Sequence, residues 1–143
     1  MLINNINYRT IWMEDAHVCM INQLVLPHKF EIYRSKKYAD TANAIRTMVV
    51  RGSPAIGAAG AFGIAQACLE FRGINIDKFR ENVLIAEKLL KSTRPTAYDL
   101  SYAIDFVKDK IMQKYSVEHS KISAVEYANK YADWNAELCR KIG

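Results

Sequence analysis

The spacing of hydrophobic residues changes once along this 143-residue chain, close to residue 35. Before that point, short runs rich in β-branched and aromatic residues predict three strands. The runs are Tyr8–Met13, Val18–Gln23 and Phe30–Arg34. Glu14-Asp15-Ala16 and Leu26-Pro27-His28 supply the turn and the break between them. Because the links are short, we expect an antiparallel three-stranded meander.

From residue 36 onward, apolar residues recur at the three- and four-residue spacing of helices. The predicted helices are Tyr38–Met48, Ser53–Arg72, Asp77–Lys91, Thr96–Tyr115 and Ser120–Ile142. Gly73 is expected to stop the second helix, and Asp77 to cap the third. The pattern predicts a single α+β domain over residues 1–143, β-rich in 1–35 and a bundle of about five helices in 36–143.

Residues Val50–Leu69 form a run of small and apolar residues that holds four of the six glycines. Its length is compatible with a membrane span, but its charged start and its many Gly and Ala residues favour a buried helix. The N-terminus lacks a basic stretch followed by an apolar one, so no signal peptide is expected. The expected location is the cytoplasm.

The start of this run has the features of an anion-binding helix N-terminus. Ser53 is the predicted N-cap, and Pro54 suits the first helical position. Free N–H groups and the helix dipole attract anions at such a start, and Arg51 could add a bidentate contact to a phosphate. The alternative interpretation is a buried helix whose small residues only allow close packing.

A similar junction follows at Thr93–Asp99. Pro95 disfavours helical geometry at Arg94, so the next helix should begin after it. Thr96 and Asp99 have the spacing of a capping box, with Asp99 one carbon shorter than the usual Glu. Because each junction places an arginine just outside a helix, we expect both to face one dianionic group.

These motifs carry a family resemblance. Met48–Gly57, preceded by Ala44-Ile45-Arg46, resembles the signature of methylthioribose-1-phosphate isomerases. Thr93–Ala97 is similar to their second motif, and Leu26-Pro27 ahead of Phe30–Tyr33 fits their early region. The wider superfamily includes other sugar-1-phosphate isomerases and the regulatory subunits of translation initiation factor 2B.

The resemblance implies roles for individual residues. Arg51, Gly52 and Ser53 of the first motif and Arg94 of the second are expected to bind the substrate. Ser53 stands where many family members have alanine. Family enzymes are more than twice as long, and their catalytic cysteine and aspartate lie in a second, nucleotide-fold-like half. The resemblance therefore implies that these 143 residues lack the catalytic domain, contain no catalytic residue and are inactive alone.

The function implied is that of a substrate-positioning domain. The reaction would convert an aldose 1-phosphate into a ketose 1-phosphate, with S-methyl-5-thioribose 1-phosphate of methionine salvage as the leading substrate. No cofactor is expected. The expected partners are the missing C-terminal domain, or a chain that supplies it, and a second copy in a homodimer. Two alternatives remain: a regulatory subunit related to initiation factor 2B without catalysis of its own, and a purely structural dimerisation domain.

The composition of the chain argues against three further classes of protein: nucleic-acid-binding, disulfide-stabilised and metal-binding proteins. The net charge of +5 suits phosphates, but Lys36-Lys37 is the longest basic run, and such dispersal argues against direct nucleic-acid binding. Cys19, Cys68 and Cys139 fit a reducing compartment better than a disulfide framework, and Cys68 is expected in the core. Neither the cysteines nor the three scattered histidines have the spacing of metal ligands, so no metal is expected.

Two further residue groups have competing interpretations. Tyr127, Tyr131 and Trp134 share one helix face, and core or interface packing is favoured over a base-stacking platform. Glu14 and Asp15 are adjacent and would point to opposite faces of a strand, so a turn is favoured over paired acid–base catalysis.

Overall fold

The computed structural model describes residues 2–3, 6–7 and 9–142. Its main sheet contains β3 (Ile11–Glu14), β4 (His17–Ile21) and β5 (Ile32–Ser35), in the antiparallel order β3-β4-β5. This confirms the predicted meander, with strand ends shifted by one to three residues. A second, two-stranded sheet pairs β1 (Leu2–Ile3) with β2 (Ile6–Asn7), and was not predicted because two-residue strands carry no periodic signal.

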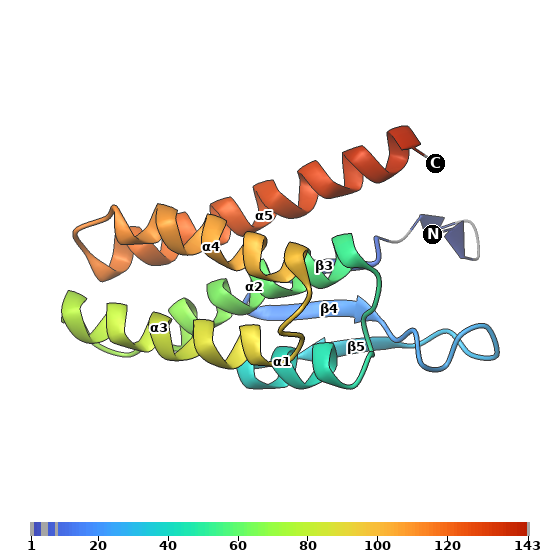
Figure 1. Cartoon of the computed structure of the whole chain (residues 1–143), viewed down its shortest axis with the longest axis horizontal. Coiled ribbons are helices and arrows are strands. Elements are labelled where there is room, and N and C mark those ends of the chain that lie inside the picture. The colour runs from blue at the N-terminus through green and yellow to red at the C-terminus, as the bar shows by residue number, and fades with distance from the viewer. Residues whose placement is uncertain (1, 4–5, 8, 143) are drawn as a thin grey trace.

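Within the described residues, five helices follow the sheet, which confirms the α+β prediction. They are α1 (Tyr38–Arg46), α2 (Ser53–Glu70), α3 (Ile76–Ser92), α4 (Tyr98–Met112) and α5 (Val117–Ile142). Figure 1 shows α2 running through the middle of the molecule, with the other helices and the β3-β4-β5 sheet around it. None of the described helices is long and apolar enough to cross a membrane.

Helix α2 is the centre of the core, as the run of small and apolar residues predicts. Every residue from Ile56 to Cys68 is buried. Its glycines let neighbouring helices approach closely, because a Cβ at Gly60 would lie 2.6 Å from Leu100 Cδ1 and one at Gly63 would lie 2.9 Å from Leu90 Cδ2. Small residues are thus required where α4 and α3 cross α2.

The predicted caps of α2 and α4 are wrong. Gly52, not Ser53, is the N-cap of α2, and Ser53 is the first helical residue. Ala97 occupies the N-cap of α4, so the capping box expected between Thr96 and Asp99 does not form. The reason is tertiary: the Ser53 hydroxyl donates to Asp99 Oδ2 at 2.5 Å, so each polar side chain bonds to the other helix instead of to its own backbone.

The predicted cap of α3 and the predicted stop of α2 are also wrong. Asn75 caps α3, since its Oδ1 accepts from the Lys78 N–H at 3.0 Å, and Asp77 lies inside the first turn. Helix α2 ends at Glu70 with an extended Phe71, so Gly73, at a φ of 120°, lies in the following loop.

A buried polar network joins the sheet to the helices. Gln66 on α2 donates through Nε2 to the carbonyl oxygens of Ser35 and Ala16, at 3.0 and 3.2 Å. The Thr41 hydroxyl donates to Gln66 Oε1 and lies 2.5 Å from the Ser35 hydroxyl. Because buried polar groups are costly when unpaired, these bonds fix the position of β5 and α1 on α2.

The turn at Glu14-Asp15 is confirmed, with Asp15 at a φ of 53°. Glu14 ends β3 and pairs with Arg34 across the sheet at 2.8 Å, and this hydrogen bond holds the pKa of Glu14 below its usual range.

Cys68 is fully buried in the core, as predicted. The side chain of Cys139 lies outside the described part of the chain.

The aromatic residues of α5 divide between core and surface. Tyr131 is 3% exposed, which confirms packing for this residue, whereas Trp134 is 53% exposed.

No group of three His, Cys, Asp or Glu side chains that could hold a metal ion occurs among the described residues.

Candidate functional site

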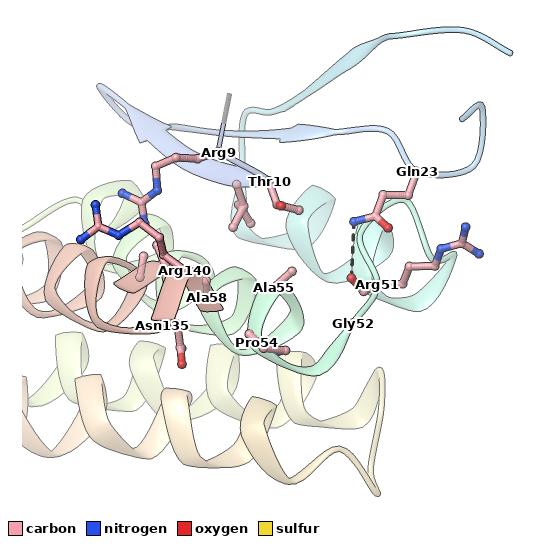
Figure 2. Close-up of a pocket in the computed structure, with 13 residues that line it drawn as sticks. Arg9, Thr10, Gln23, Arg51, Gly52, Pro54, Ala55, Ala58, Asn135 and Arg140 are labelled. Carbon is pink, nitrogen blue, oxygen red and sulfur yellow. Dashed lines mark hydrogen bonds between the residues drawn. The ribbon is translucent and has the colours of Figure 1, made fainter. Parts of the chain in front are cut away.

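A cavity of about 570 Å³ lies where the start of β3, the start of α2 and the last turns of α5 meet (Figure 2). The lining residues are Arg9, Thr10, Ile11, Gln23, Arg51, Gly52, Pro54, Ala55, Ala58, Ala132, Asn135, Ala136 and Arg140. This volume is within the range of small-molecule sites. The cavity contains the N-terminus of α2 that the sequence singles out as an anion site.

The backbone at the start of α2 depends on a glycine. Gly52 has a φ of 92° and a ψ of 133°, a conformation that side chains rarely adopt. A Cβ at Gly52 would meet nothing within 4 Å, so torsion and not close approach explains this glycine. The Ile56 N–H bonds to the Gly52 carbonyl at 2.9 Å. The N–H groups of Ser53 and Ala55 come before the Ile56 N–H, the first intrahelical donor, so they have no acceptor within the helix and are available to a ligand.

Both the backbone and the side chain of Arg51 contribute to the cavity. Its carbonyl oxygen accepts from Gln23 Nε2 at 3.4 Å, which ties the Arg51–Gly52 segment to the end of the sheet. Its exposed guanidinium has no ion pair within the described part of the chain. Figure 2 shows this guanidinium extending away from Arg9 and Arg140. It is therefore a cation available to an anion at the edge of the cavity.

Ser53 and Arg94, unlike Arg51 and Gly52, are not among the residues that line the cavity. The Ser53 hydroxyl is held by Asp99, which brings the start of α4 against the start of α2. Arg94 is half-buried in the turn before α4, where its carbonyl accepts from the Ala97 N–H at 3.0 Å. The structure thus joins the two junctions through Ser53 and Asp99, and a shared contact with one anion stays a prediction.

Two arginines that the sequence did not indicate lie at the other end of the cavity. Arg9 pairs with Asp133 at 2.7 Å across 124 positions of sequence, and Arg140 pairs with Glu137 at 2.6 Å. Figure 2 shows both guanidinium groups at the side of the cavity away from Arg51. No local motif marks them, because only the packing of α5 on β3 brings residues from the two ends of the chain to one cavity.

The wall between the two basic ends is largely apolar. Its apolar members are Ile11, Pro54 and four alanines, at positions 55, 58, 132 and 136, while Thr10, Gln23 and Asn135 add polar groups to the lining. The lining therefore suits an anionic ligand with an apolar part. Among the lining residues that the structure describes there is no carboxylate, histidine or cysteine, so these residues can bind and orient a ligand but do not themselves act as general acid or base.

Tyr131 of α5 packs against the first turns of α2 at Gly57. A Cβ at Gly57 would lie 2.8 Å from the Tyr131 hydroxyl oxygen and 3.1 Å from the Asp99 carbonyl oxygen. Burial raises the pKa of Tyr131, so the phenol stays protonated at neutral pH. The first turns of α2 are thus held by both α4 and α5, which fixes the orientation of the N–H groups at its start.

Comparison with known proteins gives a consistent result. Residues 49–143 match the model of the initiation factor 2 subunit family. The methylthioribose-1-phosphate isomerase of Bacillus velezensis is 33% identical over 135 residues, which are 94% of this chain and 38% of that protein. The chain spans about 40% of the length of the curated relatives it matches.

Solved structures agree in fold. The 5-methylthioribose 1-phosphate isomerase of Pyrococcus horikoshii superposes with a TM-score of 0.84 at 35% identity, over 87% of this chain and 36% of that one. Subunit delta of the translation initiation factor eIF-2B from A. fulgidus superposes with a TM-score of 0.80, also at 35% identity, over 92% of this chain and 37% of that one. The similarity thus extends to both an isomerase and an initiation factor subunit.

Proposed function

The chain belongs to the initiation factor 2 subunit family, and from this premise we propose that it binds and positions a sugar 1-phosphate for an aldose–ketose isomerase. The leading substrate is S-methyl-5-thioribose 1-phosphate, in agreement with the names of the similar enzymes. In this proposal the product is the corresponding ribulose 1-phosphate. The role of this chain is to bind the phosphate and the sugar.

The observation that carries the proposal is the start of α2. Gly52 turns the chain so that a helix begins at the cavity, beside Arg51, whose guanidinium has no ion pair with any described residue. A phosphate placed there would accept from the N–H groups of Ser53 and Ala55 and from the Arg51 guanidinium. Charge-assisted bonds of this kind are stronger than neutral ones, and the dipole of an 18-residue helix adds to them.

The apolar wall suits the rest of this substrate. A methylthio group is apolar, and the alanines at positions 55, 58, 132 and 136 offer an apolar surface beside the phosphate position. Burying a ligand against such a surface contributes about 25 cal/mol for each Å² of apolar area. The cavity thus provides contacts for both ends of the molecule.

The chemistry of the reaction requires more than this cavity supplies. The anomeric oxygen of a sugar 1-phosphate is esterified, so the ring cannot open as in a free sugar. An acid must act on the ring oxygen, and a base must move the proton between C1 and C2. The described lining residues include neither group. In this proposal, Arg51 and the start of α2 hold the phosphate while groups outside this lining transfer the protons.

A second candidate function is a regulatory subunit without turnover, favoured by the TM-score of 0.80 with the initiation factor subunit. The two functions can be told apart by whether a sugar phosphate binds and by whether a larger partner co-purifies with the chain. The regulatory function predicts stable co-purification with a larger partner and no turnover of any sugar phosphate. The isomerase function predicts selective binding of a sugar 1-phosphate.

Calorimetric titration with S-methyl-5-thioribose 1-phosphate tests the proposal. Arg51→Ala is expected to weaken binding by more than about 1.5 kcal/mol, the scale of a hydrogen bond to a charged group. Arg94→Ala tests the second motif in the same way. Arg46→Ala is the matched control, because Arg46 is an exposed arginine at the end of α1 and away from the cavity lining. Equal affinity in the wild type and in Arg51→Ala would refute the phosphate assignment.

A further inference from the structure

Six aromatic side chains form a connected row along the seam between α4 and α5, which we call the aromatic line. The members are Tyr98, Tyr102 and Phe106 on α4, and Tyr127, Tyr131 and Trp134 on α5. Five rings follow one another in the order 98, 102, 131, 106 and 127, and the ring of Trp134 joins the row at Tyr131. Neighbouring ring centroids in the line lie between 6.0 and 6.3 Å apart. Figure 1 shows these two helices side by side, with α5 at the upper edge of the molecule.

The middle of this line is hollow. A pocket of about 290 Å³ is lined by Tyr102, Phe106, Lys130, Tyr131 and Trp134. Tyr131 is almost fully buried and forms the floor, whereas Tyr102 is 46% and Trp134 is 53% exposed. Its size is close to the lower end of known small-molecule sites, roughly 300–1,000 Å³. The pocket shares no lining residue with the cavity at the start of α2.

Two lysines place positive charge at one end of the line. The ammonium groups of Lys130 and Lys110 lie 4.8 and 5.4 Å from the centre of the Tyr127 ring. Lys130 also pairs with Glu126 at 3.1 Å, and both side chains are more than half exposed. Because exposed ion pairs contribute little to stability, Lys130 can change partner at small cost.

We propose that this pocket binds one nucleotide. The base stacks on the exposed rings of Tyr102 and Trp134 above Tyr131, and the phosphate pairs with Lys130 and Lys110. Aromatic side chains bind bases through stacking regardless of sequence, and nearby cations bind the phosphate. The two ammonium groups disfavour a cationic ligand. A wholly apolar ligand would leave both charges unused.

The charge pattern favours a single nucleotide over a nucleic-acid strand. A strand needs a groove of positive charge that follows its backbone. The basic residues of this chain are dispersed, with Lys36-Lys37 as the longest run. Lys130, which lines the pocket, and Lys110, which lies on the neighbouring Tyr127 ring, provide positive charge at one end of the aromatic line only, as a single phosphate group requires.

Calorimetric titration of the full chain with UMP and GMP tests this proposal, since the two differ in the size of the base. Trp134→Leu and Tyr102→Leu are each expected to weaken nucleotide binding by at least about fivefold, the lower end of what one stacked base contributes. Lys130→Met is expected to weaken the binding of UMP and to leave the affinity for uridine, which has no phosphate, unchanged. Tyr115→Leu is the matched control, since Tyr115 is 92% exposed and outside the line.

Several results would overturn the proposal. One is that neither nucleotide binds at millimolar concentration. Another is that binding is unchanged in Trp134→Leu and Tyr102→Leu while circular dichroism shows both variants folded. Much tighter binding of oligouridylate than of UMP would assign the surface to a strand. A dimer that depends on Trp134 in sedimentation, without nucleotide binding, would assign it to a second copy of the chain.

Discussion

The hydroxyl of Ser53 donates to the carboxylate of Asp99 at 2.5 Å, and this bond joins the starts of α2 and α4 across 46 positions of sequence. Asp99 lies in the first turn of α4, where a negative charge also interacts favourably with the helix dipole. The bond therefore holds the two segments that carry the family motifs against each other.

Removing this bond should lower stability by a modest, measurable amount. Ser53→Ala is expected to reduce the free energy of unfolding by about 0.5–1.5 kcal/mol, because the bond involves a charged acceptor but is exposed. A double-mutant cycle with Asp99→Ala, followed by urea unfolding, isolates the pair. A coupling energy of at least about 0.5 kcal/mol is expected. Strictly additive effects would mean that the two side chains do not interact in solution.

The torsion of Gly52 gives a second prediction. Gly52→Ala should reduce the free energy of unfolding by about 1–3 kcal/mol, the cost of forcing a side chain into this region. Gly73→Ala is the matched control, since Gly73 has a φ of 120° and does not line the cavity. Both substitutions should destabilise the fold, but only Gly52→Ala should also weaken sugar phosphate binding. Equal binding by both variants would separate the α2 start from the ligand.

The glycines on α2 should tolerate no large side chain. Gly57→Leu and Gly60→Leu place atoms where Tyr131 and Leu100 already lie, so they should unfold the domain or lower its melting temperature sharply. Overpacking of this kind costs about 1–3 kcal/mol and occasionally more. Lys88→Leu, on the exposed face of α3, is the control and should change stability by less than about 0.5 kcal/mol. An unchanged melting temperature for Gly57→Leu would contradict the packing of α5 on α2.

Burial should make the core cysteines unreactive. Burial raises the pKa of Cys68 to about 12, and it also raises the pKa of Cys19. A raised thiol pKa leaves little of the nucleophilic thiolate near neutral pH. Iodoacetamide is therefore expected to modify both thiols in urea and neither in the folded chain, with peptide mass mapping reading each cysteine separately. Rapid modification of Cys68 without urea would show that α2 is accessible.

The sequence predicts the elements better than it predicts their contacts. The α2 helix follows from the length of its run of small and apolar residues, because the run from Val50 to Leu69 is too long for a typical buried strand. The three-stranded meander follows from β-rich runs with short links. Periodicity depends only on near neighbours in sequence, so these features can be read locally.

The caps and the cavity could not be read in this way. Ser53 is a good N-cap residue, but packing brings Asp99 within 2.5 Å, and the hydroxyl bonds to the carboxylate instead. Arg9 and Arg140 line the same cavity although they lie near opposite ends of the chain. Arg51 and Gly52 also line this cavity, and a sequence motif marks them, whereas no motif marks residues that only tertiary packing brings together.

The central claim is that a sugar phosphate binds at the start of α2, and amide chemical shifts test it most directly. S-methyl-5-thioribose 1-phosphate is added to the ¹⁵N-labelled chain while two-dimensional NMR spectra are recorded. We predict the largest, saturable shifts at the amides of Gly52, Ser53 and Ala55, and their loss in Arg51→Ala. Unchanged spectra, or shifts confined to the seam between α4 and α5, would contradict the claim.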